Sequence, residues 1–448
     1  MTQVLPISSP PGDPSTVHES LSRHLLVDGF DLVLDLHRSS GATIVDARTG
    51  AAYLDMFTFF ASNALGMNHP ALVEDAEFRD DLLTAALHKP SNSDIYTEPM
   101  ARFVDTFARV LGIPELPHLF FVEGGALAVE NALKVAFDWK SRRNEEAGRD
   151  PRLGTRIMHL EHAFHGRSGY TMSLTNTDPI KVARFPAFDW PRIPSAYVRD
   201  GADMESVERQ SLAAAREHFD RHPHDIAALV LEPIQGEGGD HHFRPTYLRA
   251  LQDLCHEYDA LFVVDEVQTG VGITGTAWAH QQLGIEPDVV AFGKKTQVCG
   301  IMAGRRVDLV RDNVFRVGSR INSTWGGGLA DMVRARRILE VVEQDGLIER
   351  AAELGAVLGD ALADLAVRHP AVSEVRGRGL MRAVSLPDTE TRDAVVTDLR
   401  EREHVLMLGC GDRSIRFRPA LTVTENDLRS AVAALDRVLT RRSIRPRV

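Results

Sequence analysis

The sequence predicts an α/β protein whose large domain has an α/β/α arrangement around a mostly parallel sheet. From about residue 118, short apolar runs alternate with longer amphipathic segments, in the order HLFFV, ALAVENALKVAFDWKSRR, RIMHL, IAALVLEPI, PTYLRALQDLCHEYDA, LFVVDEV and PDVVAFG. Such alternation is typical of βαβ units. In the first long segment Val129, Ala132, Leu133, Ala136 and Phe137 recur at helical spacing, which predicts one apolar stripe that lies on the sheet.

The regular alternation of short apolar runs and amphipathic segments is not found toward either end of the sequence. The N-terminal part contains the strand-like IVDARTGAAYLDMF, and long amphipathic segments beyond residue 330 precede RGLMRAVSL and SIRFRPAL. We therefore predict a smaller α+β domain formed by both chain ends, over residues 21–75 and 330–448, and a large domain over residues 76–329. Because residues 1–20 are rich in Pro and Ser, we expect a flexible tail there.

Composition argues against several classes of partner. The formal net charge is -12, from 63 acidic and 51 basic residues, so nucleic acid is not an expected partner. No apolar run approaches the ~18 to 20 residues that cross a bilayer, and the first residues lack the pattern of an export signal. With three cysteines and no CxxC pair, the expected location is a reducing cytoplasm.

Two lysines follow an apolar run in VVAFGKKTQVCG, at Lys294 and Lys295. A strand that ends at Phe292 would bring them to the edge of the sheet where open α/β folds bind ligands. A solvated surface turn is the plainer alternative.

The segment FFVEGGALAVENALK runs from a predicted strand through Gly124 and Gly125 into a predicted helix. The free N–H groups and the helix dipole would then meet at Gly125 and Ala126 and form an anion-binding cradle. Alternatively, the glycines only make a tight turn. No Lys follows them, so this is not a nucleotide P-loop.

In LFVVDEVQTG, Asp265 and Glu266 stand at the end of a β-branched run, where a buried carboxylate needs a cation. The strand that binds Mg²⁺ in ATPases also consists of apolar residues followed by acidic ones. The chain lacks the phosphate-binding motif GxxxxGK[ST] that accompanies this strand in ATPases. Gly270, Gly272 and Gly275 spell a dinucleotide-binding GxGxxG, yet acidic residues occupy the strand exit and would repel a pyrophosphate.

The loop in HLEHAFHGRSG offers Phe164, His165 and Arg167 together, which suits a planar anionic ligand. His162 and His165 raise the alternative of a metal site with the later His241 and His242. No HExxH motif or Cys/His cluster supports that alternative, and no metal is expected.

Glu237 lies between glycines in EPIQGEGGD, and Arg416 and Arg418 stand in SIRFRPAL. Together the sequence offers an anion cradle, an aromatic ring, an Asp able to hold a protonated ring nitrogen, a strand-end Lys and arginines for carboxylates. These are the groups that pyridoxal 5'-phosphate requires.

The chain resembles the class-III aminotransferases, fold-type I pyridoxal phosphate enzymes, over residues ~20 to 440. The resemblance lies in six motifs: FHGR at 164–167, EPIQGEGG at 232–239, VVDEVQTGVGITG at 263–275, FGK at 292–294, STWGG at 323–327 and RFRPAL at 416–421. Three variants, GGALA, GITG and GKKTQVCG, are similar to the L-lysine 6-aminotransferase branch of that family. Gly328 and Leu329 stand where the family commonly has Asn-Pro.

The resemblance implies roles for individual residues. Lys294 would bind the cofactor covalently and transfer protons, and Asp265 would hold the ring nitrogen. The other implied cofactor contacts are Gly125 and Ala126 to the phosphate, Phe164 and His165 at the ring, Gln268 to the ring oxygen, and Thr324 to the phosphate of a neighbouring subunit. The last contact implies a homodimer with active sites at the subunit interface.

The resemblance also implies two substrates. The ε-amino group of L-lysine would pass to 2-oxoglutarate, giving L-glutamate and L-2-aminoadipate 6-semialdehyde, which cyclises. Arg167 would hold the outer carboxylate of each substrate, and Glu237 would cover Arg416 except when a dicarboxylate binds. Gln268 and Asn322 complete the implied substrate-binding set. Ornithine or 4-aminobutyrate aminotransferases remain alternatives, as does an aminomutase or decarboxylase on the same fold.

Overall fold

A seven-stranded sheet forms the centre of the larger half of the chain. The computed structural model describes residues 12–444. The strands run in the order β3 (His118–Val122), β11 (Cys299–Ala303), β10 (Val289–Phe292), β9 (Leu261–Asp265), β6 (Ile226–Leu231), β4 (Arg156–Leu160) and β5 (Arg192–Ile193). The five strands from β10 to β5 are parallel, and β11 is antiparallel to β10 and β3. The predicted α/β fold with a mostly parallel sheet is confirmed.

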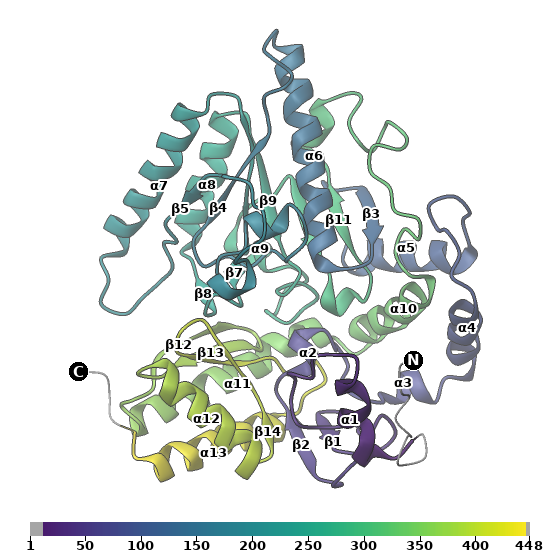
Figure 1. Cartoon of the computed structure of the whole chain (residues 1–448), viewed down its shortest axis with the longest axis vertical. Helices are drawn as coiled ribbons and strands as arrows, with labels where there is room; N and C mark the ends of the chain where they lie inside the picture. The colour runs from purple at the N-terminus through teal and green to yellow at the C-terminus, as the bar shows by residue number, and fades with distance from the viewer. Residues whose placement is uncertain (1–11, 445–448) are drawn as a thin grey trace, which may run out of the picture.

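Helices cover both faces of this sheet, in the upper part of Figure 1. On one face the apolar stripe of α6 (Gly125–Glu146) packs against alternate strand residues such as Ile157 and Val263. On the other face Met158 and Phe262 pack against α7 (Met204–Arg221) and α8 (Pro245–Glu257). The same face continues over α4 (Ala76–Leu87), α5 (Glu98–Val110), α9 (Ala279–Leu283) and α10 (Leu329–Gln344).

Segments from the N-terminal and the C-terminal parts of the chain together form the smaller half, in the lower part of Figure 1. The strand β14 (Val405–Leu406) pairs in parallel with β2 (Ala52–Asp55), which pairs with β1 (Thr43–Val45). A second, antiparallel sheet has the order β12 (Ser373–Arg378), β13 (Met381–Ser385), β16 (Ser414–Phe417) and β15 (Leu408–Cys410). Its helices are α11 (Leu347–Arg368), α12 (Thr389–Arg402) and α13 (Glu425–Arg442).

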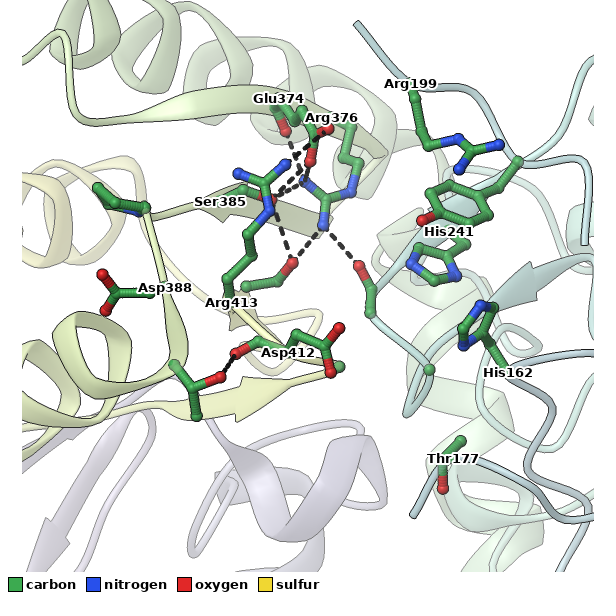
Figure 2. Close-up of a pocket in the computed structure, with 17 residues that line it drawn as sticks. His162, Thr177, Arg199, His241, Glu374, Arg376, Ser385, Asp388, Asp412 and Arg413 are labelled. Carbon is green, nitrogen blue, oxygen red and sulfur yellow. Dashed lines mark hydrogen bonds and ion pairs between the residues drawn. The ribbon is translucent and has the colours of Figure 1, made fainter. Parts of the chain in front are cut away.

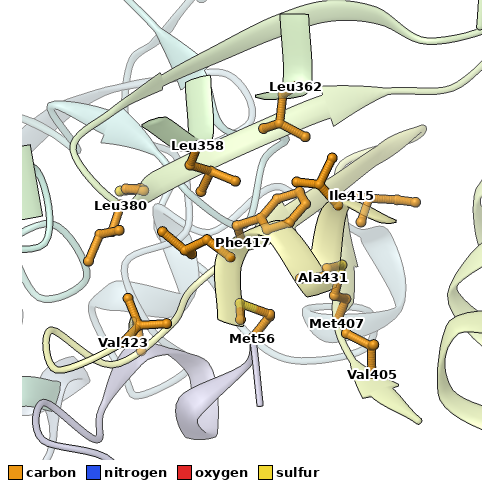
Figure 3. Packing of buried hydrophobic residues seen from close by; sticks show 14 of the residues in the cluster. Met56, Leu358, Leu362, Leu380, Val405, Met407, Ile415, Phe417, Val423 and Ala431 are labelled. Atoms are coloured by element: carbon orange, nitrogen blue, oxygen red, sulfur yellow. The ribbon is translucent and has the colours of Figure 1, made fainter. Parts of the chain in front are cut away.

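One apolar core joins these segments. Met56, from the N-terminal part, is buried among Leu358, Ile415 and Phe417 from the C-terminal part (Figure 3). Helix α10 contributes to this core and to the core of the larger half, so the boundary predicted at residue 330 falls at the start of a helix that both halves share. The predicted domain boundaries stay a prediction.

The remaining short elements connect these layers. They are η1 (Pro14–Thr16), α1 (Val17–Ser22), α2 (Thr58–Ala61), α3 (Pro70–Val73), η2 (Thr171–Ser173), η3 (Pro179–Lys181), β7 (Ile234–Gln235), β8 (His241–His242), η4 (Lys294–Thr296) and η5 (Arg305–Leu309). Of the tail expected over residues 1–20, residues 1–11 lie outside the described part, whereas residues 14–20 are helical. No helix between residues 12 and 444 is long and apolar enough to cross a membrane.

Candidate active site

Four neighbouring parallel strands end at the same edge of the large sheet and create the site. The register places Leu231 beside Val264 and Asp265 beside Ala291, so the residues that follow β6, β9 and β10 lie next to one another. A cavity of about 400 Å³ opens there, lined by Gly125, Ala126, Phe164, His165, Gly166, Arg167, Glu232, Glu237, Asp265, Val267, Gln268, Lys294 and Cys299. Every predicted site residue except Asn322, Thr324 and Arg416 lines this cavity, and Arg416 lies 3.2 Å from Glu237, which does.

The two adjacent lysines point in different directions. Lys294 lines the cavity, and its Nζ donates to the backbone oxygen of Phe60 at 2.9 Å. The Nζ of Lys295 is buried and donates to the backbone oxygens of Ala61 at 3.1 Å and Gln268 at 2.9 Å. The solvated-turn alternative is thus wrong, and only Lys294 faces the cavity.

The amine of Lys294 gains a proton less readily than an ordinary lysine. Burial lowers the pKa of Lys294 to about 8, and the positive charges of Arg416 and Arg418 act in the same direction. Burial also lowers the pKa of Lys295 well below its usual value, with the charge of Lys294 as the next cause. The cations that depress the pKa of Lys294 most are therefore the arginines and not the neighbouring lysine.

A turn in the left-handed region forms the wall that faces the lysines. The φ angles of Thr58 to Ala61 are all positive, between 42° and 64°, a conformation that costs roughly 1–2 kcal/mol per non-glycine residue. Hydrogen bonds from Lys294 and Lys295 to this turn offset part of that cost. The exposed ring of Phe60 lies 5.9 Å from both Lys294 Nζ and the Arg416 guanidinium. No local sequence signal predicted this turn.

Asp265 is held by two hydrogen bonds. Its Oδ2 lies 2.8 Å from Nδ1 of His165, and its Oδ1 accepts from the backbone N–H of Val267 at 3.0 Å. Burial opposes a charge on His165, but the hydrogen bond and negative charge of Asp265 outweigh it and raise the pKa of His165. Asp265 therefore has a buried hydrogen-bond partner whose charged form it favours. His165, predicted as a cofactor contact, directs Nδ1 at Asp265.

Glu232 is a site residue that was not predicted from the sequence. Its side chain accepts hydrogen bonds from the backbone N–H groups of Phe164 at 3.0 Å and Gly236 at 3.1 Å. Burial raises its pKa to about 7. Glu232 therefore ties the FHGR loop to the loop that carries Glu237. Its position directly after a buried strand was the available signal.

Gln268 has a fixed amide orientation. Its Oε1 accepts two hydrogen bonds from Arg418, from Nε at 3.1 Å and from Nη2 at 3.0 Å. Arg418 is buried and also pairs with the buried Asp240. Because a guanidinium only donates, the Oε1 of Gln268 must face Arg418, and its NH₂ group remains available as a donor.

The predicted anion cradle lies at the start of α6. Its N-cap is Gly124, with φ +99°, and no side chain caps the first turn. The FHGR loop approaches this turn closely, because a Cβ on Gly166 would lie 2.4 Å from the Cβ of Ala126. The N–H groups of the first turn can therefore bind a phosphate.

The two arginines that were predicted to bind carboxylates differ in burial and in their ion pairs. Arg416 is 3% exposed, and its Nη1 lies 3.2 Å from Oε2 of Glu237. Arg167 is exposed, and no described residue forms a hydrogen bond or ion pair with its guanidinium. Asn322 and Thr324 lie on an exposed loop outside the cavity of their own chain.

A second cavity, of about 510 Å³, lies behind the loop that carries Glu237 (Figure 2). Arg376 and Arg413, which line it, are already paired. Arg376 donates to the backbone oxygens of Gly239 and Asp240, and Arg413 lies 2.9 Å from Glu374. The two bonds from Arg376, a residue of β12, fasten the loop to the small-domain sheet.

The glycines and histidines that suggested a dinucleotide or a metal ion have structural roles in the fold. A Cβ on Gly272 or Gly275 would lie within 3 Å of residues of α11, so these glycines permit close packing. His165 pairs with Asp265, whereas the ring of His162 contacts His241. Within residues 12–444 no three His, Cys, Asp or Glu side chains are grouped to hold a metal ion.

Comparison with known proteins adds a family assignment. The family model "Aminotransferase class-III" matches residues 27–439. An L-lysine-epsilon aminotransferase of Mycobacterium tuberculosis is 63% identical over 429 residues, 95% of each chain. One of Streptomyces clavuligerus is 58% identical over 427 residues, 94% of this chain and 93% of the relative. The solved structure of the M. tuberculosis lysine aminotransferase in its internal aldimine form has a TM-score of 0.94 and 62% identity, and covers 95% of this chain and 99% of that chain.

Proposed function

The chain belongs to the class-III aminotransferases, and from this we propose that it transfers the ε-amino group of L-lysine to 2-oxoglutarate. The products are L-glutamate and L-2-aminoadipate 6-semialdehyde, which closes to a cyclic imine. The observation that carries the proposal is the contrast between an unpaired Arg167 at the cavity and a buried Arg416 covered by Glu237. One arginine is ready for a carboxylate, and the other is available only when Glu237 leaves.

Class-III aminotransferases use pyridoxal 5'-phosphate, and the residues of this cavity fit it. The uncapped first turn of α6 suits the phosphate, and the anionic Asp265 suits a protonated ring nitrogen. When bound, the cofactor supplies an aldehyde that condenses with amines and a ring that accepts the electrons of a broken C–H bond. Gly125 and Ala126 would hold the phosphate, and Phe164 would lie against the ring.

Two residues would hold polar atoms of the ring. Asp265, fixed by His165 and Val267, would accept a hydrogen bond from the N–H of the ring nitrogen and so keep that nitrogen protonated. Gln268 would donate from Nε2 to the ring oxygen, because Arg418 occupies its Oε1.

Lys294 would be the covalent attachment point and the acid–base residue. A pKa of about 8 leaves an appreciable neutral fraction near neutral pH, so the amine can attack the aldehyde of the cofactor. Once the incoming substrate amine releases it, Lys294 would remove a proton from Cε of lysine and deliver a proton to C4' of the cofactor.

Substrate selection would depend on both arginines. L-lysine would place its α-carboxylate on Arg167 while Glu237 keeps Arg416 covered. 2-Oxoglutarate and L-glutamate would place the distal carboxylate on Arg167 and the inner carboxylate on Arg416, so Glu237 would have to move away. The Asn322 side chain would also contact the substrate, as the family resemblance implies.

We propose a homodimer as the active form. Exposed apolar side chains support this proposal, among them Phe60, Tyr96, Leu127 and Trp325. Thr324 lies on the same exposed loop as Trp325, from which it would reach the phosphate of the partner's cofactor.

Ornithine and 4-aminobutyrate remain alternative amino donors. Ornithine is one methylene shorter than lysine, and such a difference is worth only ~1–3 kcal/mol in a binding pocket. An aminomutase or a decarboxylase would use the same cofactor without 2-oxoglutarate.

Rapid mixing of the purified holoenzyme with single amino donors tests this function. L-lysine, L-ornithine and 4-aminobutyrate are compared in separate runs, with L-glutamate as the positive control and the cofactor absorbance as the signal. We expect fast conversion by lysine, reversal by 2-oxoglutarate and a product with the mass of the cyclic imine. Faster conversion by another donor would change the substrate, and turnover without 2-oxoglutarate would favour a mutase or decarboxylase.

A further inference from the structure

Glu237 is bound by two cations, one at each carboxylate oxygen. Its Oε2 lies 3.2 Å from Nη1 of Arg416, and its Oε1 lies 2.7 Å from Nζ of Lys181. Lys181 comes from η3, in a different part of the chain from Arg416, and no sequence motif singled it out. The Glu237–Arg416 pair therefore has a third member.

Lys181 is held in place beside the cavity. Its Nζ lies 3.3 Å from Oγ1 of Thr177 and 5.6 Å from the ring centre of Phe164. The turn that carries it begins at Asp178, whose Oδ1 accepts from the N–H of Ile180 at 3.0 Å. The side chain of Lys181 is 22% exposed, so water screens its charge only in part.

The backbone of Glu237 is fixed. Its backbone oxygen accepts from the N–H of Gly411 at 2.9 Å. Arg376, which lines the second cavity in Figure 2, donates to the backbone oxygens of Gly239 and Asp240. Any movement of Glu237 away from Arg416 is therefore a rotation of its side chain, which can keep Oε1 on Lys181.

We propose that Lys181 is a positioning residue that retains Glu237 when this side chain leaves Arg416, and thereby lowers the cost of admitting a dicarboxylate. This inference rests on the proposed function, because it assumes that lysine and glutamate alternate in one cavity. A carboxylate that loses its cation in a partly buried place leaves an uncompensated charge, which is costly. Burial raises the pKa of Glu237, but Arg416 and Lys181 outweigh it and lower the pKa overall, so the carboxylate stays charged.

The number of cationic partners of Glu237 in each state determines which substrate the loss of Lys181 affects more. While Glu237 covers Arg416, it has two cationic partners, and removal of Lys181 leaves one. After Glu237 has moved away, Lys181 is its single remaining partner, and removal of Lys181 leaves none. Loss of Lys181 therefore penalises the state that binds a dicarboxylate more than the state that binds lysine.

The test uses the holoenzyme and three variants. Lys181→Met removes the charge and keeps the length of the side chain, and Lys181→Arg restores the charge. Lys134→Met, at an exposed lysine of α6, is the matched control for the loss of one surface charge. Each protein is titrated with glutarate, which requires both arginines, and with hexanoate, which requires only Arg167. The half-reactions with lysine and glutamate are measured in parallel.

We expect Lys181→Met to raise the dissociation constants of glutarate and glutamate about three- to tenfold, the range of a partly exposed ion pair. Hexanoate binding and the lysine half-reaction should change less than about twofold, Lys181→Arg should restore glutarate binding, and Lys134→Met should match the unmodified enzyme. Unchanged or tighter glutarate binding in Lys181→Met would overturn the inference, as would equal weakening of glutarate and hexanoate. Failure of lysine to react in the unmodified enzyme would instead refute the proposed function, while the glutarate comparison would still report on Lys181.

Discussion

The guanidinium of Arg418 donates two hydrogen bonds to Oε1 of Gln268 and so decides which end of that amide faces the cavity. Arg418 is itself immobilised by its pair with the buried Asp240. Arg418 does not line the cavity itself, but it leaves the NH₂ group of Gln268 free to donate a hydrogen bond there.

Gln268→Glu is expected to retain the fold and lose activity. A glutamate can still accept from Arg418, but it presents an oxygen in place of the Nε2 donor. Loss of one hydrogen bond to a charged group costs ~1.5–3 kcal/mol, so kcat should fall at least about tenfold. Steady-state kinetics measure kcat, and thermal denaturation checks that the melting temperature is retained. Full activity would show that Gln268 does not donate to the cofactor.

Capture of pyridoxal 5'-phosphate by the apoenzyme should accelerate as pH rises through about 8. The pKa of Lys294 is lowered to about 8, so its amine is protonated and unreactive below that pH and neutral above it. The rate of absorbance change after mixing, measured from pH 6.5 to 9.5, gives the midpoint. Nα-acetyl-lysine is the control, with a side-chain pKa of about 10.4. A rate in the protein that still rises like that of the control at pH 9.5, with no midpoint within the measured range, would contradict a depressed amine pKa.

Glu237→Ala should weaken the preference for lysine over glutamate as amino donor. Without its carboxylate, Arg416 stays uncovered, so glutamate binds without displacing a side chain and the lysine complex contains an unpaired buried cation. The ratio of kcat/KM for lysine to that for glutamate should fall at least about tenfold. Half-reaction rates over a range of each amino acid provide the ratio. An unchanged ratio would mean that Glu237 does not discriminate between the substrates.

Gly166→Ala should weaken cofactor binding. Gly166 has a φ of +116°, and an added Cβ would lie 2.4 Å from the Cβ of Ala126, so the FHGR loop would have to move away from the cradle. The dissociation constant of the cofactor should rise at least about tenfold, equivalent to ~1.4 kcal/mol. Gly201→Ala is the matched control, because Gly201 also has a positive φ, +74°, but an added Cβ there meets nothing within 4 Å. Equal effects of the two variants would attribute the loss to backbone conformation alone.

The order and periodicity of the residues were enough to predict the sheet and the residues at its ligand-binding edge. Lys294, Asp265 and Gly125 each follow an apolar run, and the carboxyl ends of parallel strands converge, so their proximity could be predicted from order and periodicity. The same reasoning expected a cationic partner for Asp265, and His165, whose pKa Asp265 raises, lies 2.8 Å from its Oδ2.

Two ion pairs beside the cavity became known only from the tertiary structure. Arg418 pairs with Asp240, and Lys181 pairs with Glu237. The partners in each pair are many residues apart, so no local spacing in the sequence predicts that they interact. The direction of Lys295 likewise depends on where the N-terminal turn at Ala61 packs. Periodicity identifies the elements because it reflects the geometry of a single helix or strand, whereas the partner of a buried charge depends on which distant segments fold against it.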